Sequence, residues 1–458
     1  MMAVIKSNKK NKIRLIQNIC IAGNIRHYRP GVLTKDPVIN LLLIIFVIRP
    51  IIDLPYDDSI VLGINLAGLT AVLVLSLGMV CVIRHPRLKF LKFEYWLFIY
   101  MGIAFCSALI HLSNLSDFAY VARMLSSLVF LFCVAPRIEK DTLKKCYKLF
   151  IFASLIPIAI SFMQVMHLVP FTYFDHSMGR EIGRASGGYR HPSSLVRVVM
   201  FSIIYTFYLM ENDWSKWKKN LCAVSYLALA ISSIIISYLR SGYFTLVIIV
   251  CLWYFLKYKR NMTKLFCKVL GIGIIVILAF SVVYSQGLLQ VNLQEFTRFF
   301  AISNIINKDA GGTSGFYLRG RFAFIQRLMI SLKASPAYVV LFGNGVDVSI
   351  YNGINMKIAD MHFIRLIWNC GIVGFAVWGV YILSFFKNIW KKRKRNIDKM
   401  FINMAICLFV FYFLWGITKE PTTQPNFMYH IFLIGGFVCH NEYLKKEGIV
   451  HAVSGKKN

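Results

Sequence analysis

The sequence predicts an all-α membrane protein whose chain crosses the bilayer about twelve times. Of its 458 residues, 57% are apolar and 16% are charged, and the mean hydropathy is +0.61. The apolar residues fall into blocks close to the roughly 20 residues that an α-helix needs to cross the hydrocarbon layer. This arrangement excludes a water-soluble globular protein.

Twelve apolar segments are long enough, or nearly so, to span the bilayer. In chain order they are residues 37–52, 59–83, 96–112, 118–135, 147–168, 194–210, 221–239, 243–258, 265–285, 362–386, 400–418 and 424–440. Residues 1–36 are basic and contain no cleavable apolar core, so they are predicted to be a cytoplasmic N-terminus and not a signal peptide.

The chain is thereby divided into five parts. Residues 1–36 precede the membrane region, and residues 37–285 hold spans 1–9 with an outer loop at 169–193. Residues 286–361 form one large extracytoplasmic loop between spans 9 and 10, residues 362–440 hold spans 10–12, and residues 441–458 form a cytoplasmic tail.

The basic residues indicate which side each loop faces. With both termini inside, 36 of the 52 Lys and Arg residues fall in cytoplasmic segments and 11 in outer loops, which agrees with the positive-inside rule. The net charge of +32 therefore reflects topology, and the run KKRKR at 391–395 is interpreted as an orientation signal near anionic lipid headgroups. No nucleic-acid partner is expected.

Five arginines remain, and all lie within spans or at their edges: Arg49, Arg123, Arg197, Arg240 and Arg365. An arginine within the bilayer is costly and normally faces the bundle interior, where it binds a ligand or a partner side chain. Arg49 and Arg197 lie near span ends and best suit interfacial positions or ion pairs. Because carboxylates are scarce in the spans, the surplus of guanidinium groups points to an anionic ligand such as a phosphate.

Two outer loops carry enough polar residues to build a site. The loop before span 6 contains MGREIGRASGGYRHPSS, in which arginines alternate with glycines. Glycine allows the backbone to approach a bulky ligand and expose N–H donors, and arginine supplies positive charge. The second loop contains an amphipathic stretch at 286–310, the segment SGFYLRGRFAFIQRLMISL, and the motif LFGNGVD, which is interpreted as a tight turn.

The predicted topology brings the candidate site residues to the outer face. They are Arg184, Arg190, Arg240, Arg319, Arg321, Asp360, His362 and Arg365. The chain has no HExxH, CxxC, GxSxG or Walker motif, so zinc hydrolysis and ATP use have no support, and no cofactor or metal is expected.

The order of these motifs resembles the superfamily of O-antigen polymerases (Wzy-type) and O-antigen ligases. The resemblance covers residues 170–385 and rests on RASGGYRHPSS, SYLRSGY, YLRGRFAF, LFGNGVD and the following GIVG. It implies a GT-C-like fold in the bacterial inner (plasma) membrane. It also implies a metal-independent glycosyltransferase that transfers a glycan from undecaprenyl pyrophosphate to a lipid-linked acceptor repeat, at the outer face of that membrane.

The resemblance also suggests roles for single residues. Ligases of the superfamily usually place a His eleven residues before the first Gly that enters span 10; here that Gly is Gly371 and the position holds Asp360, with His362 two residues later. This departure favours a polymerase of O antigen, capsule or exopolysaccharide over a ligase, and leaves Asp360 and His362 as rival candidates for the general base. The arginines would hold the pyrophosphate, and a chain-length regulator and a flippase are the implied protein partners.

Two other functions remain open. A flippase for lipid-linked oligosaccharides would also have about twelve spans and intramembrane arginines, but many transporters consist of two similar halves, and this sequence shows no repeat. A non-enzymatic membrane scaffold would need its polar residues only as structural partners.

Overall fold

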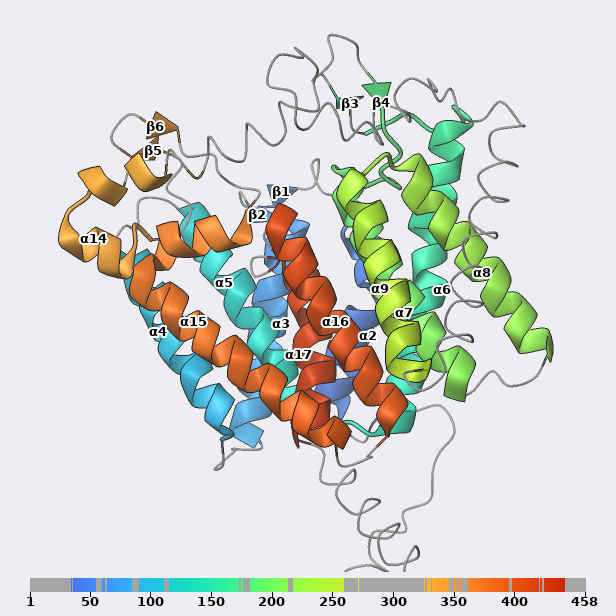
Figure 1. Cartoon of the computed structure of the whole chain (residues 1–458), viewed down its shortest axis with the longest axis horizontal. Coiled ribbons are helices and arrows are strands. Elements are labelled where there is room, and N and C mark those ends of the chain that lie inside the picture. The colour runs from blue at the N-terminus through green and yellow to red at the C-terminus, as the bar shows by residue number, and fades with distance from the viewer. Residues whose placement is uncertain are drawn as a thin grey trace, which may run out of the picture.

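The computed structural model shows a bundle of long α-helices (Figure 1). It describes residues 34, 36–54, 60–61, 64–84, 90–110, 115–172, 174–175, 182–212, 217–258, 271, 325, 328–330, 332–345, 350–351, 354–355, 361–394, 398–419, 421 and 424–440.

Helices occupy every expected span except 265–285, which lies outside the described residues apart from residue 271. They are α2 (Pro37–Ile52), α3 (Leu66–Arg84), α4 (Lys92–Ile110), α5 (Leu115–Val129) continued by the π-helical turn η1 (Phe130–Val134), α6 (Lys140–Val165), α7 (Pro192–Asn212), α8 (Trp217–Ile236), α9 (Arg240–Tyr258), α15 (His362–Lys394), α16 (Lys399–Thr418) and α17 (Pro425–His440). A short helix, α14 (Ala337–Phe342), precedes α15.

Five of the described helices are long and apolar enough to cross a membrane. They correspond to α6, α7, α9, α15 and α16, and five shorter apolar helices accompany them. The structure therefore agrees with an all-helical membrane protein, whereas the full count of twelve spans stays a prediction.

Local sequence explains where several helices start and bend. Asp36 caps α2, its side chain accepting the N–H of Val38 at 2.9 Å, and Pro37 occupies the first turn, where its missing N–H costs nothing. α15 is broken at Gly371, whose φ of 68° and ψ of −174° are not helical. The first part of α15 consequently lies at a steep angle to the long remainder (Figure 1).

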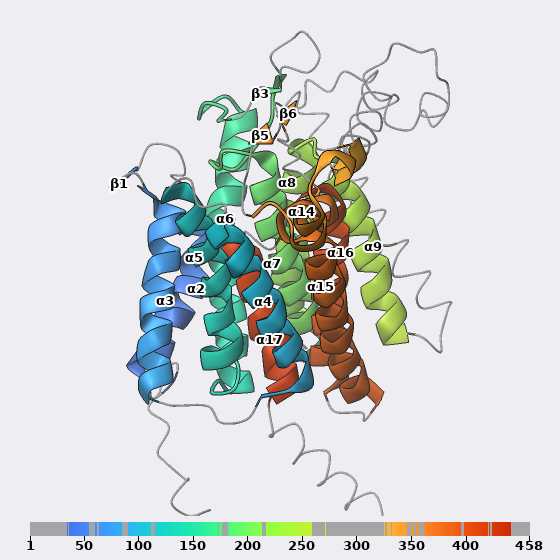
Figure 2. The same cartoon turned by 90° about the vertical axis from the view of Figure 1, so that its left-hand side faces the viewer.

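Three two-residue strand pairs lie at the same end of the bundle, which we call the hairpin end (Figures 1 and 2). They are β1 (Ile60–Val61) with β2 (Ile64–Asn65), β3 (Phe174–Asp175) with β4 (Ile182–Gly183), and β5 (Ile350–Tyr351) with β6 (Ile354–Asn355). The last two pairs belong to loops predicted to lie outside, and the first occupies the outer start of the expected span 59–83. The hairpin end is therefore the end that the predicted topology assigns to the outer face.

Ion pairs and a histidine–carboxylate contact join helices at the opposite end of the bundle. Lys140 at the start of α6 pairs with Asp398 before α16, and Lys257 at the end of α9 pairs with Glu211 of α7. His440 Nε2 lies 2.8 Å from Oε1 of Glu94, whose side chain is fully buried. These pairs tie helix ends that are distant in the sequence.

Candidate functional site

The loop at 184–191, between β4 and α7, is fixed to α6 by hydrogen bonds to its backbone. Oε1 of Gln164, on α6, accepts the N–H groups of Ser186 at 2.9 Å and Gly187 at 3.0 Å. Gly187 has a φ of +65°, and a Cβ there would lie 2.6 Å from the carbonyl oxygen of Pro157. Only glycine fits this position without strain. The glycines predicted to let backbone approach a ligand thus serve, at Gly187, to let the loop approach α6.

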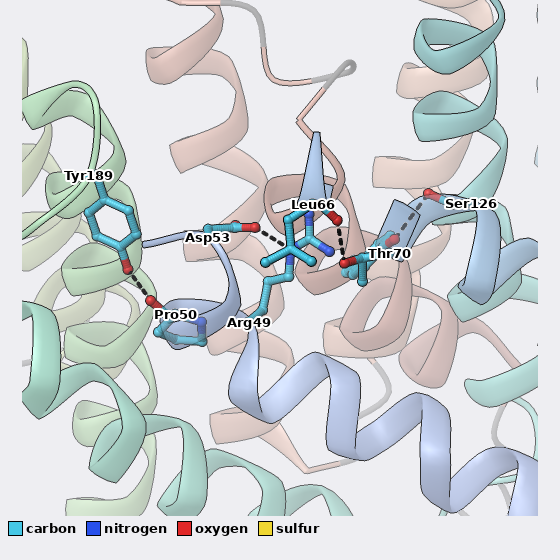
Figure 3. A network of polar contacts seen from close by, with 8 residues as sticks. Arg49, Pro50, Asp53, Leu66, Thr70, Ser126 and Tyr189 are labelled. Carbon is cyan, nitrogen blue, oxygen red and sulfur yellow. Dashed lines mark hydrogen bonds and ion pairs between the residues drawn. The ribbon is translucent and has the colours of Figure 1, made fainter. Parts of the chain in front are cut away.

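Tyr189 joins the same loop to α2. Its hydroxyl donates to the carbonyl oxygen of Pro50 at 2.6 Å (Figure 3), and its own carbonyl accepts from the Thr172 hydroxyl at 2.6 Å. Burial raises the pKa of the Tyr189 hydroxyl well above its usual value, and the nearby Asp53 carboxylate raises it further. Tyr189 therefore stays a neutral donor, while Arg184 in the same loop is half-buried and Arg190 is exposed.

Replacing Tyr189 with phenylalanine should loosen this loop. The variant loses the hydrogen bond and leaves the Pro50 carbonyl without this donor, so we expect a loss of about 1–3 kcal/mol in unfolding free energy. Thermal unfolding in detergent and limited proteolysis at 184–191 measure the effect. Tyr338→Phe is the matched control because Tyr338 is 57% exposed; equal behaviour of the two variants would contradict the assigned role.

A buried ion pair between Arg49 and Asp53 lies at the end of α2. Nε of Arg49, near the end of α2, is 2.9 Å from Oδ1 of Asp53, and the two side chains are 3% and 8% exposed (Figure 3). The Arg49 guanidinium also lies 5.8 Å from the ring centre of Tyr429, whose hydroxyl is 3.0 Å from that of Ser126. Arg49 thus has an ion-pair partner at the residue that follows its helix, as its position near a span end predicts.

Arg197 lies on α7 and is buried. Its guanidinium donates to Oε1 of Gln424, the residue that precedes α17. Arg197 therefore connects α7 to the residue before α17, whereas Arg49 pairs with the residue that caps its own helix. Both arginines have partners within the protein, which matches their interpretation.

His362 begins α15 and is fully buried. Its Nε2 lies 3.0 Å from the hydroxyl of Tyr412 on α16, which also accepts the indole N–H of Trp378 at 3.3 Å. A Cβ on Gly416 would lie 3.4 Å from Cδ2 of His362, so the imidazole packs directly on α16. Arg365, three residues on, is half-buried.

The first part of α15, before the break at Gly371, ends in hydrogen bonds to the turn at residues 343–345. The carbonyl oxygens of Trp368 and Asn369 accept the backbone N–H groups of Asn344 at 2.9 Å and Gly345 at 3.1 Å. Ser107 of α4 also donates to the Asn369 carbonyl, at 2.8 Å. Of the motif LFGNGVD, the described residues 341–345 dock against α15, and this docking was not predicted. A pair of glycines in each segment was the only signal in the sequence.

The remaining candidates are placed less fully. Arg240 is the first residue of α9, whereas Arg319, Arg321 and Asp360 lie outside the described residues. Arg184 and Arg190 share a loop held by α2 and α6; His362 and Arg365 share the first part of α15, held by α4 and α16. All four belong to the hairpin end, in two groups supported by different helices.

Within the part of the chain that the structure describes, no three His, Cys, Asp or Glu side chains are close enough to hold a metal ion. No model of a known protein family matches the chain, and no curated protein matches it by sequence.

Proposed function

We propose that this protein is a membrane-embedded polymerase of polysaccharide repeat units. It would transfer a glycan from undecaprenyl pyrophosphate to a lipid-linked acceptor repeat at the outer face of the bacterial inner membrane, with about twelve spans in a GT-C-like arrangement. One observation carries most weight: an arginine-bearing loop and a broken helix with His362 and Arg365 meet the same end of an apolar helical bundle (Figure 1).

The proposed reaction suits arginines without a metal. The bond between the sugar C1 and the pyrophosphate oxygen breaks, a bond forms between C1 and the acceptor hydroxyl oxygen, and the hydroxyl proton passes to a base. Undecaprenyl pyrophosphate leaves with the negative charge that develops on its terminal phosphate, and fixed guanidinium groups stabilise this charge in a site of low dielectric constant. We assign this role to Arg184, Arg190, Arg240, Arg319, Arg321 and Arg365.

The surroundings of His362 bear on the choice of base. Its imidazole is enclosed by Tyr412, Trp378 and Gly416 of the helical core. A general base must come within hydrogen-bond reach of the hydroxyl proton that it removes. We therefore assign the base to Asp360 and a positioning role to His362, which fixes the start of α15 against α16.

Asp360→Asn should abolish polymer growth, because the amide cannot accept the proton; we expect a loss of about 100-fold or more. His362→Gln should lower the yield of folded protein, with the remaining molecules keeping most of their activity. The assay supplies purified protein in lipid nanodiscs with lipid-linked repeats, without ATP or an ion gradient, and follows product length. Lys333→Gln is the control, since Lys333 is an exposed basic residue of the same predicted loop.

The same assay separates the alternatives. Attachment of a finished polymer to a lipid A core acceptor, without elongation, would identify a ligase. Movement of lipid-linked repeats across the bilayer without new glycosidic bonds would identify a flippase. Full activity of Asp360→Asn together with loss in a well-folded His362→Gln would reverse the assignment of the base.

A further inference from the structure

The turn at residues 343–345, which we call the latch turn, supplies hydrogen-bond donors at the break in α15. A helix that ends at a break leaves its last four carbonyl groups without intrahelical partners. Two of these, on Trp368 and Asn369, accept N–H groups from the latch turn at 2.9 and 3.1 Å. The backbone of the predicted outer loop therefore completes a helix that lies elsewhere in the sequence.

The contact is made backbone to backbone. Gly343 has a φ of +86°, and a Cβ there would fall well inside 3.0 Å of the Asn369 carbonyl; a Cβ on Gly371, with φ of +68°, would do the same at the Leu341 carbonyl oxygen. Real Cβ atoms essentially never approach so closely. The sequence thus keeps a glycine on each side of the junction, which allows close docking without a side chain between the two segments.

One side chain opposes the docking. Asn344 is 1% exposed, and among the described residues neither its amide nitrogen nor its amide oxygen has a hydrogen-bond partner. A buried polar group without a partner forfeits the hydrogen bonds that it makes in water. Asn344 therefore favours release of the latch turn, whereas its own backbone N–H favours docking.

We propose that the latch turn is a releasable strap that controls the first part of α15. When docked, it holds residues 362–370 from one end while the hydrogen bond between His362 and Tyr412 holds the other. When released, Asn344 regains water and residues 362–370 lose two of the hydrogen bonds that fix them, so they pivot more readily at Gly371. Any effect of this motion on catalysis rests on the proposed function, because His362 and Arg365 lie on the moving segment. The existence of the strap does not depend on the proposed function.

Amide hydrogen exchange tests the strap directly. The full-length protein in nanodiscs is compared with Asn344→Ala, and mass spectrometry follows peptides that contain residues 343–345. Alanine keeps the backbone N–H and removes the unpaired amide, so we expect exchange of the latch turn to slow by about tenfold. Gly379→Ala is the matched control, because a Cβ on Gly379 meets nothing within 4 Å.

Unchanged or faster exchange in Asn344→Ala would overturn the proposal, since it would mean that the Asn344 amide does not oppose docking. Gly343→Ala should expose the latch turn to rapid exchange; protection equal to that of the unmodified protein would also overturn it. Polymer growth is measured separately on the same samples. Slower exchange in a protein without polymerase activity would keep the strap and remove the proposed function.

Discussion

Replacing Gly371 with alanine is expected to destabilise the protein severely. The new Cβ would overlap the backbone of Leu341 and Phe342, and backbone atoms cannot move aside as the end of a flexible side chain can. The φ of +68° adds strain for any residue with a side chain. Strain of about 1–3 kcal/mol combines with overpacking of similar size, so we expect a loss of about 3 kcal/mol or more.

Thermal unfolding of the purified protein in detergent measures this loss, with size-exclusion chromatography reporting the folded fraction at each temperature. Gly379→Ala adds the same methyl group to the same helix, where it meets nothing within 4 Å, and should change the midpoint little or favour the helix slightly. Similar midpoints for the two variants would mean that the break in α15 and its contact with Leu341 contribute nothing to stability.

The helices were predictable because the bilayer imposes a length on apolar segments. The expected span 37–52 coincides with α2, and span 400–418 differs from α16 by one residue at its start. The less accurate boundaries have local causes. α4 starts at Lys92 instead of residue 96, because Glu94 is buried at the helix start and its carboxylate accepts the Leu91 N–H at 2.6 Å.

The contacts that shape the candidate site were not predictable in the same way. Asp53 was assigned to an outer loop, yet it caps α2 and pairs with Arg49, a pairing that depends on where the helix ends. The latch turn meets Trp368 and Asn369 through backbone atoms, and backbone hydrogen bonds leave almost no trace in the choice of side chains. Such contacts are set by the packing of several helices together.

Breaking the buried pair of Arg49 and Asp53 from one side is expected to cost far more than removing both charges. The guanidinium remains charged when its partner is lost, because arginine is not deprotonated in proteins. Removal of one partner from a buried ion pair costs about 3–5 kcal/mol, whereas exchange of both for apolar residues of similar size is often close to neutral. We therefore expect Asp53→Leu to lose about 3–5 kcal/mol and Arg49→Met/Asp53→Leu to recover most of that loss.

A double-mutant cycle in thermal unfolding, completed by Arg49→Met, measures the coupling between the two side chains. Asp141→Leu is the control, because Asp141 pairs with Lys144 at 3.7 Å while 80% exposed, and such surface pairs contribute about 0–1 kcal/mol. An equal loss in the single and double variants would mean that Arg49 stabilises the hairpin end through contacts other than Asp53. Recovery in the double variant would instead mean that the charge of Arg49 is neutralised within the protein. In that case only the arginines of the loops and of α15 would serve the proposed pyrophosphate site.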